Sequence, residues 1–143
     1  MYPYTYTASL RANHPSQDLS FLSALFSLER RHGWIAGEER MTPKGARLGD
    51  IRTESYWSAC IAPGKVSSEV QQLEDLLEHS AAAVLELADK LTDFYATGGK
   101  LNYFISLYGI RNYGLVFSSR LMQKLAEARI ELQLDIYPNE SGL

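Results

Sequence analysis

Four short stretches of the chain alternate between apolar and polar residues, the pattern that is typical of β-strands with one buried face. They cover residues 4–11, 51–61, 101–108 and 130–137. In the first stretch Tyr4 and Tyr6 lie on one face, and Thr5 and Thr7 lie on the other. Both faces of the third stretch are largely apolar, so we expect that strand near the centre of the sheet.

Three further segments place apolar residues three or four positions apart, as amphipathic helices do. We expect these helices over residues 17–28, 68–95 and 118–128. Ser16 and Ser118 or Ser119 are suitable N-caps for the first and third helices, and Ser68 with Gln71 has the spacing of a capping box. The second helix would span roughly 40 Å, which is longer than a small sheet, so we expect a break near His79 and Ser80.

The order of elements is β-α-β, a long helix, and then β-α-β. This order predicts an α+β fold with a four-stranded sheet and helices packed mainly on one face, resembling a ferredoxin-like arrangement with an added helix. Residues 1–143 fit a single domain, with a short tail over 138–143. Residues 29–50 combine glycines with many charges and predict a long loop, a kind of segment that often carries function.

The formal net charge is −3 and the isoelectric point is about 5.6. This balance argues against a nucleic-acid partner held by a broad cationic face. One cysteine, Cys60, excludes a disulfide within the chain and a cysteine-rich zinc site. The sequence shows neither a signal peptide nor an apolar run long enough to cross a membrane, so we expect a cytoplasmic protein that is not held by a membrane.

Catalytic motifs are absent from the pattern. His14, His32 and His79 do not share a metal-ligand spacing with other ligating residues, and the glycines do not form a phosphate-binding loop. Cys60, on a predicted strand, is expected to behave as a buried apolar group rather than as a nucleophile. We therefore predict a protein without catalytic residues, cofactor or metal ion.

Three groups of residues are candidates for binding a partner. The first belongs to the long loop and its end, where Trp34 would anchor a charged surface: Trp34, Glu38, Glu39, Asp50 and Glu54. The second is the acidic face of the long helix: Glu74, Asp75 and Glu78. The third is an aromatic cluster with an arginine: Tyr108, Arg111 and Tyr113. For the first two groups the alternative is a solvated polar surface, and for the third it is ordinary packing of half-buried tyrosines.

Several segments together resemble the bacterial family DUF4279. They are the opening strand Tyr-Thr-Tyr-Thr-Ala-Ser-Leu-Arg, the helix end Leu-Phe-Ser-Leu-Glu, the pair Trp34 and Gly37, the pair Tyr56 and Trp57, and the closing run Leu-Gln-Leu-Asp-Ile-Tyr. The resemblance extends over about residues 4–138. Members typically carry a proline just after the first helix, whereas Arg30 follows Glu29 here. The resemblance implies a small α+β domain and brings no established activity.

These observations favour a non-enzymatic protein-binding domain. Small acidic one-domain proteins recur among bacterial immunity proteins, which bind and neutralise a cognate toxin, and an acidic surface would suit a basic toxin domain. The alternative is a small-molecule sensing or regulatory domain that uses the cleft near the long loop and the aromatic cluster. An enzyme is the third hypothesis, and it would need a histidine beside a carboxylate or cysteine.

Overall fold

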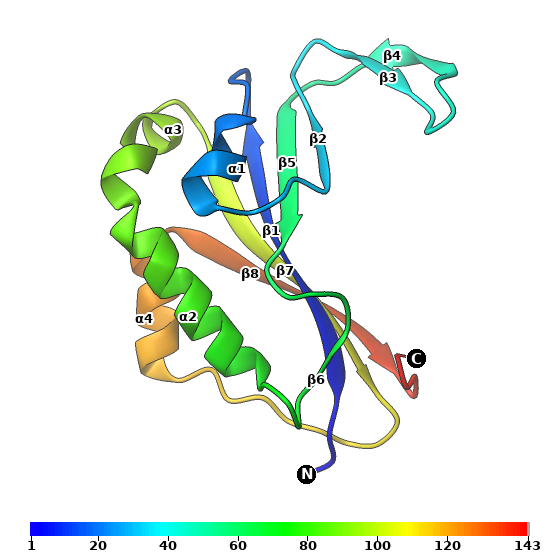
Figure 1. The fold of residues 1–143 in the computed structure, drawn as a ribbon, viewed down its shortest axis with the longest axis vertical. Coiled ribbons are helices and arrows are strands. Elements are labelled where there is room, and N and C mark those ends of the chain that lie inside the picture. The colour runs from blue at the N-terminus through cyan, green and yellow to red at the C-terminus, as the bar shows by residue number, and fades with distance from the viewer. Residues whose placement is uncertain (143) are drawn as a thin grey trace.

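A computed structural model describes residues 1–142 and shows an α+β fold (Figure 1). The strands are β1 (Thr5–His14), β2 (His32–Trp34), β3 (Glu39–Met41), β4 (Arg47–Ile51), β5 (Ser55–Cys60), β6 (Val66–Ser67), β7 (Lys100–Gly109) and β8 (Ile130–Pro138). The helices are α1 (Phe21–Phe26), α2 (Leu73–Glu86), the 3-10 helix η1 (Ala88–Leu91), α3 (Thr92–Ala96) and α4 (Ser119–Glu127). The predicted fold class is therefore confirmed.

Over residues 1–142 the main sheet has six strands rather than the four predicted. Its order is β2-β5-β1-β7-β8, and β6 pairs with β1 on the side that β5 occupies. The pairs are antiparallel except β7 with β8, which are parallel and joined through α4. β3 and β4 form a separate two-stranded sheet. The number of strands was predicted wrongly because β2 and β6, the two added strands of the main sheet, have only three and two residues, too few for alternation to reveal.

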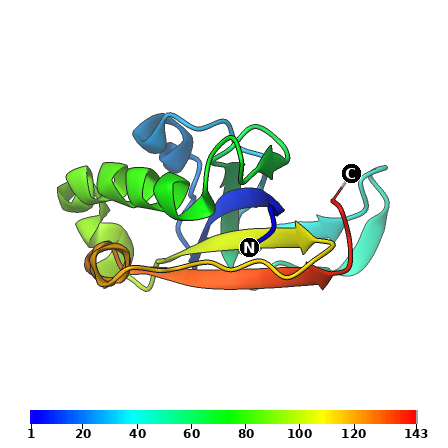
Figure 2. The same ribbon diagram turned by 90° about the horizontal axis from the view of Figure 1, so that it is seen from below.

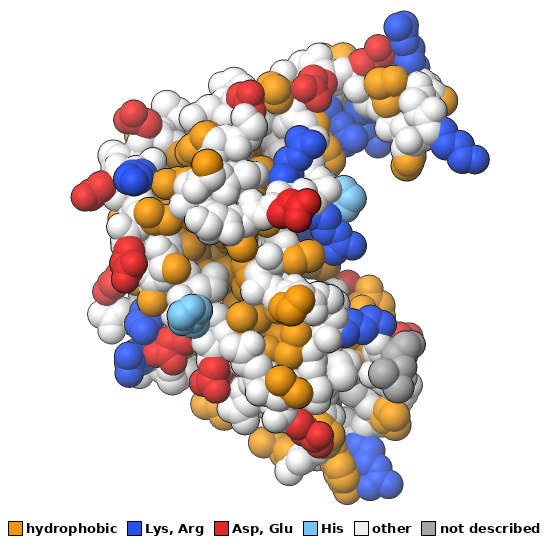
Figure 3. All heavy atoms as spheres, viewed as in Figure 1, with side chains coloured by type: hydrophobic (Ala, Val, Ile, Leu, Met, Phe, Trp, Pro, Cys, Tyr) orange, Lys and Arg blue, Asp and Glu red, His pale blue; other side chains and the backbone are white. Residues whose placement is uncertain are grey.

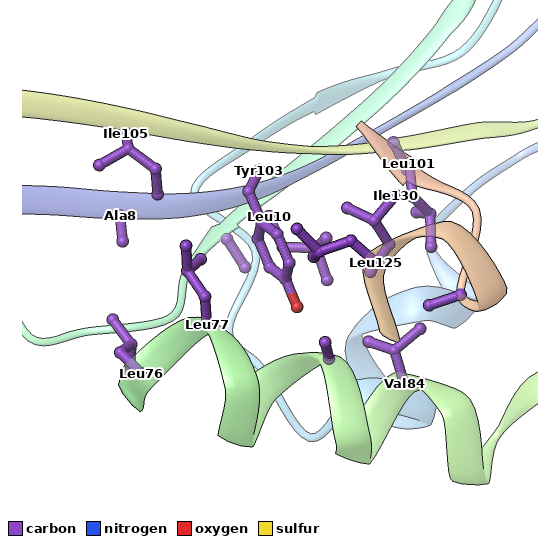
Figure 4. Packing of buried hydrophobic residues seen from close by; sticks show 14 of the residues in the cluster. Ala8, Leu10, Leu76, Leu77, Val84, Leu101, Tyr103, Ile105, Leu125 and Ile130 are labelled. Carbon is purple, nitrogen blue, oxygen red and sulfur yellow. The ribbon is translucent and has the colours of Figure 1, made fainter. Parts of the chain in front are cut away.

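The helices α1 and α2 lie on one face of the main sheet (Figure 2). Between them and the sheet lies the core, which includes Leu10 and Ile105 from the central strands and Leu77 from α2 (Figure 4). These three side chains are at most 1% exposed, and each contributes roughly 1.5–3 kcal/mol to stability through burial. The apolar sides of the predicted strands and helices thus meet as expected.

The first helix is shorter than predicted, because the buried side chain of His14 holds the preceding segment in a turn and Ser16 does not act as the N-cap. The Nδ1 atom of His14 accepts hydrogen bonds from the backbone N–H groups of Ser16 and Gln17, at 3.0 and 2.8 Å. Its Nε2 lies 2.7 Å from Thr97 Oγ1, and the side chain is 3% exposed. These bonds hold residues 14–17 in a turn, so α1 begins only at Phe21.

The long helix begins later and breaks later than predicted. The Ser68 hydroxyl accepts a hydrogen bond from the Tyr4 backbone N–H at 3.0 Å, so it does not cap a helix, and α2 starts at Leu73. Helical structure then continues through residues 79 and 80. The break falls at Leu87, after which η1 and α3 bring the buried side chains of Leu91 and Phe94 to the core.

Two further features bear on the predictions made from the sequence. Cys60 is exposed, contrary to the expectation of a buried apolar group, because it lies on the sheet face opposite Trp57 and Ala59, away from the helices. None of the helices formed by residues 1–142 combines the length and the apolar character that crossing a membrane requires.

Candidate functional site

The segment predicted as a loop over residues 29–50 is largely a β-ribbon. β2 pairs with β5 in the main sheet, and β3 pairs with β4 beyond it, so the four strands form one long bent hairpin. Backbone hydrogen bonds at the bend join Gly37 N–H to Arg52 O at 2.9 Å and Arg52 N–H to Glu38 O at 2.7 Å. We call residues 35–54 the ribbon. Figure 1 shows that it projects away from the rest of the molecule.

The turn at the tip of the ribbon follows from its sequence, Thr42-Pro43-Lys44-Gly45. Proline favours the second position of such a turn, and Gly45 adopts a φ of 87°, which a side chain would disfavour. Thr42 closes the turn, because its Oγ1 accepts a hydrogen bond from the Ala46 backbone N–H at 3.0 Å. The local sequence therefore specifies the hairpin.

Two cross-strand ion pairs along the ribbon use acidic residues that the sequence offered as partner-binding groups. Arg40 Nη1 lies 2.9 Å from Asp50 Oδ2, and Arg47 Nε lies 3.5 Å from Glu39 Oε2. Each pair is exposed and stabilises the hairpin by at most about 1 kcal/mol. The charges of Glu39 and Asp50 are thus largely balanced within the ribbon.

The base of the ribbon is a stack of three side chains around Trp34. Its ring stacks on Tyr56 with centroids 4.6 Å apart, and the guanidinium carbon of Arg52 lies 3.6 Å from the Trp34 ring centroid. Glu54 lies next to this stack along the chain and accepts a hydrogen bond from Asn13 Nδ2 at 3.1 Å. Trp34 therefore anchors the base of the ribbon through contacts within the chain.

The middle of the ribbon exposes large apolar side chains. Met41, Leu48 and Ile51 are 48%, 50% and 60% exposed, and every residue of β4 is exposed. Figure 3 shows the ribbon overhanging a hollowed flank of the molecule, with basic side chains at its tip. These three residues were not predicted from the sequence as part of a binding surface. The Thr-Pro-Lys-Gly turn was the available signal for them, because it predicts a hairpin through this segment.

The acidic residues of α2 have different roles. Glu74 accepts hydrogen bonds from the Tyr4 hydroxyl at 3.1 Å and from the Val116 backbone N–H at 3.0 Å. Glu78 lies 3.0 Å from Arg120 Nε and 3.2 Å from Lys124 Nζ, both on α4. Asp75 is exposed. Two of the three predicted partner-binding acids thus hold the fold together.

The aromatic cluster lies at the end of the main sheet that is opposite to the ribbon. The Tyr113 ring stacks on Tyr4 with centroids 5.1 Å apart and packs against Gly109, where a Cβ atom would collide with it. Tyr108 stacks on Tyr137 with centroids 4.9 Å apart. Arg111 Nη1 donates a hydrogen bond to the Tyr2 hydroxyl at 2.8 Å. Arg111 and Tyr113 therefore contact residues near the N-terminus, whereas Tyr108 stacks on the last strand.

A cavity of about 330 Å³ opens at this end of the sheet. We call it the end pocket, and its lining includes Tyr2, Thr5, Ser67, Glu69, Tyr108 and Arg111. Burial is the main cause that raises the pKa of the Tyr4 hydroxyl well above its ordinary value, so Tyr4 stays protonated and donates to Glu74. The Tyr113 hydroxyl is buried, and residues 1–142 offer it no hydrogen-bond partner.

Within residues 1–142, groups of three or more histidine, cysteine or carboxylate side chains suited to a metal ion are absent. A family model described as a domain of unknown function, DUF4279, matches residues 4–139. Neither the curated proteins nor the solved structures include a match to the chain.

Proposed function

Since the chain belongs to the DUF4279 family, whose description gives no activity, we propose from its structure that it is a non-enzymatic protein-binding domain. Its most concrete form is an immunity protein that acts in the cytoplasm and neutralises a cognate bacterial toxin by direct binding. The observation that carries this proposal is the projecting ribbon with its exposed apolar side chains.

An isolated two-stranded sheet is only marginally stable in water, so a ribbon of this kind gains from contact with a second surface. Met41, Leu48 and Ile51 are each about half exposed. Burying the remaining apolar area of all three would contribute roughly 2–5 kcal/mol. A micromolar complex needs about 8 kcal/mol, so the ribbon would supply a substantial part of the affinity, and the neighbouring surface would supply the rest.

The exposed acidic side chains support the more specific proposal that the partner is a toxin domain with a basic surface. Exposed acidic side chains follow the helical edge of the molecule, on α2, η1 and α3: Asp75, Glu86, Asp89 and Asp93 (Figure 3). Such a row would speed association with a basic partner more than it would tighten the complex. Loss of these charges should therefore lower the association rate, most clearly at low ionic strength.

The proposal is tested by co-expressing the chain with any toxic domain that a neighbouring gene encodes and measuring growth and complex formation. The triple variant M41S/L48S/I51S should bind at least about 30-fold more weakly and should fail to protect the cells. The matched control is V70S/V116S/M122S, which removes three exposed apolar side chains away from the ribbon and should protect. Equal binding by the ribbon variant and the native chain would refute the role of the ribbon.

The end pocket supports a second function, small-molecule sensing. Its volume falls in the range of ligand-binding pockets, and tyrosines and one arginine line it. A ligand there would lie at the opposite end of β1 from the ribbon, because Thr5 lines the pocket and His14 ends the strand beside the ribbon base.

A further inference from the structure

We infer that the end pocket binds a free α-amino acid with an apolar, preferably aromatic, side chain. This inference rests on the second function proposed above and names its ligand class. It is carried by three features of the pocket: its small volume, its apolar lining, and two oppositely charged side chains that lack ion-pair partners among residues 1–142.

The size of the pocket selects a small ligand. Pockets for small molecules span about 300–1,000 Å³, and 330 Å³ is at the lower limit of that range. Tyr2, Pro3 and Ile110 give its walls apolar surface, and the Tyr108 ring contributes an aromatic one. A single aromatic or aliphatic side chain suits this space better than a nucleotide does.

The charges select a zwitterion. Arg111 is exposed, its Nη1 donates a hydrogen bond to the Tyr2 hydroxyl, and its guanidinium carbon lies 4.8 Å from the Tyr2 ring centroid. Its remaining donors form the fork that binds a carboxylate. Glu69 is exposed on the β6 side of the same pocket and offers a carboxylate to an ammonium group. An α-amino acid presents both complementary charges next to one apolar side chain.

The lining is already ordered, so a ligand would lose little affinity to the cost of fixing it. The Ser67 hydroxyl accepts a hydrogen bond from the Glu69 backbone N–H at 3.2 Å, and the Thr5 hydroxyl donates one to the Ser141 carbonyl at 3.2 Å. Tyr108 is held by its stack on Tyr137, and Lys65 Nζ lies 5.2 Å from its ring centroid.

The experiment is calorimetric titration of the full chain with L-phenylalanine, N-acetyl-L-phenylalanine and L-phenylalanine amide. Phenylalanine should bind saturably, and each derivative, which lacks one charge, should bind about tenfold or more weakly. R111Q should weaken binding of phenylalanine to a similar degree and should not weaken the amide further. The matched control R11Q removes an arginine that also stacks on an aromatic ring, Phe104, but lies outside the pocket, and it should bind normally.

Absence of saturable binding of phenylalanine, tyrosine and tryptophan at millimolar concentrations would overturn the inference. Equal binding of phenylalanine and its N-acetyl derivative would also overturn it, because a plain carboxylate would then suffice. A thermal-shift screen with other metabolites separates this failure from failure of the sensing function. If another compound stabilises the native chain but not I110W, the pocket binds a small molecule and the sensing function stands, while the proposed amino-acid ligand is wrong.

Discussion

Tyr103 on β7 is fully buried and its ring points from the sheet toward α2 (Figure 4). Its hydroxyl lies 2.6 Å from Ser80 Oγ on α2. Burial raises the pKa of Tyr103 to about 12, against a smaller lowering by the Ser80 hydrogen bond. Below about pH 10 both the folded and the unfolded chain keep this proton, and the stabilisation is complete. Between about pH 10 and pH 12 the unfolded chain releases the proton while the folded chain retains it, so stability falls as pH rises.

The size of this effect follows from the difference between the two pKa values. At about pH 11 the unfolded tyrosine is mostly ionised and the folded one is not, which lowers the free energy of unfolding by about 1.4 kcal/mol. Y103F cannot undergo this change. At about pH 8 it should be less stable than the native chain by about 0.5–1.5 kcal/mol, because it lacks the hydrogen bond to Ser80.

The assay is urea unfolding of both proteins at the two pH values. The deficit of Y103F should shrink by about 1.4 kcal/mol at the higher pH, because the other tyrosines titrate in both proteins and cancel. The control S80A loses the hydrogen bond but retains the phenol, so its deficit should not shrink in this way. A deficit of Y103F that stays constant between the two pH values would refute the reasoning.

Three other substitutions test the packing described above. Trp57 lies in the core, and its indole N–H donates a hydrogen bond to Ser23 Oγ with an N–O distance of 2.9 Å. S23A removes this acceptor and should lower the free energy of unfolding, measured by urea titration, by about 1–3 kcal/mol. E78Q weakens two ion pairs to α4 and should lower the free energy of unfolding by about 0.5–1 kcal/mol at low salt but by little in concentrated sodium chloride. An equal loss of stability at both salt concentrations would contradict an ionic contact. G109A should lower the free energy of unfolding by about 1–3 kcal/mol, because its Cβ would collide with the Tyr113 ring. An unchanged melting temperature of G109A would contradict this and show that the ring can move aside.

The last two strands are among the elements that the sequence predicted best. β7 and β8 match the predicted strands within one residue, because their inward residues are apolar along most of their length. The helix from Ser118 is also confirmed, and the Ser118 hydroxyl accepts a hydrogen bond from the Leu121 backbone N–H at 3.1 Å. Here local propensity, capping and burial all favour the same structure.

The ribbon could not be predicted in the same way. Its strands are exposed, so they lack the contrast between buried and solvated faces on which periodicity depends. The end pocket was half predictable: Tyr108 and Arg111 are neighbours along the chain, whereas Tyr2 and Tyr4 join them only because β1 pairs with β7. That pairing is a property of the topology, which four predicted strands did not define.

The central position of β1 has a consequence for folding during synthesis. Thr5 pairs with Tyr108, and Asn13 pairs with Lys100, so the first strand made by the ribosome pairs along its length with one of the last. At ordinary rates of translation the partner strand emerges roughly 5–20 s later. During that interval β5, β6 and α2 are already made and can pair with β1 or cover it, but the β1 edge that β7 will occupy stays open. The nascent chain thus carries an unpaired strand edge of a kind that can pair with other chains until β7 is made.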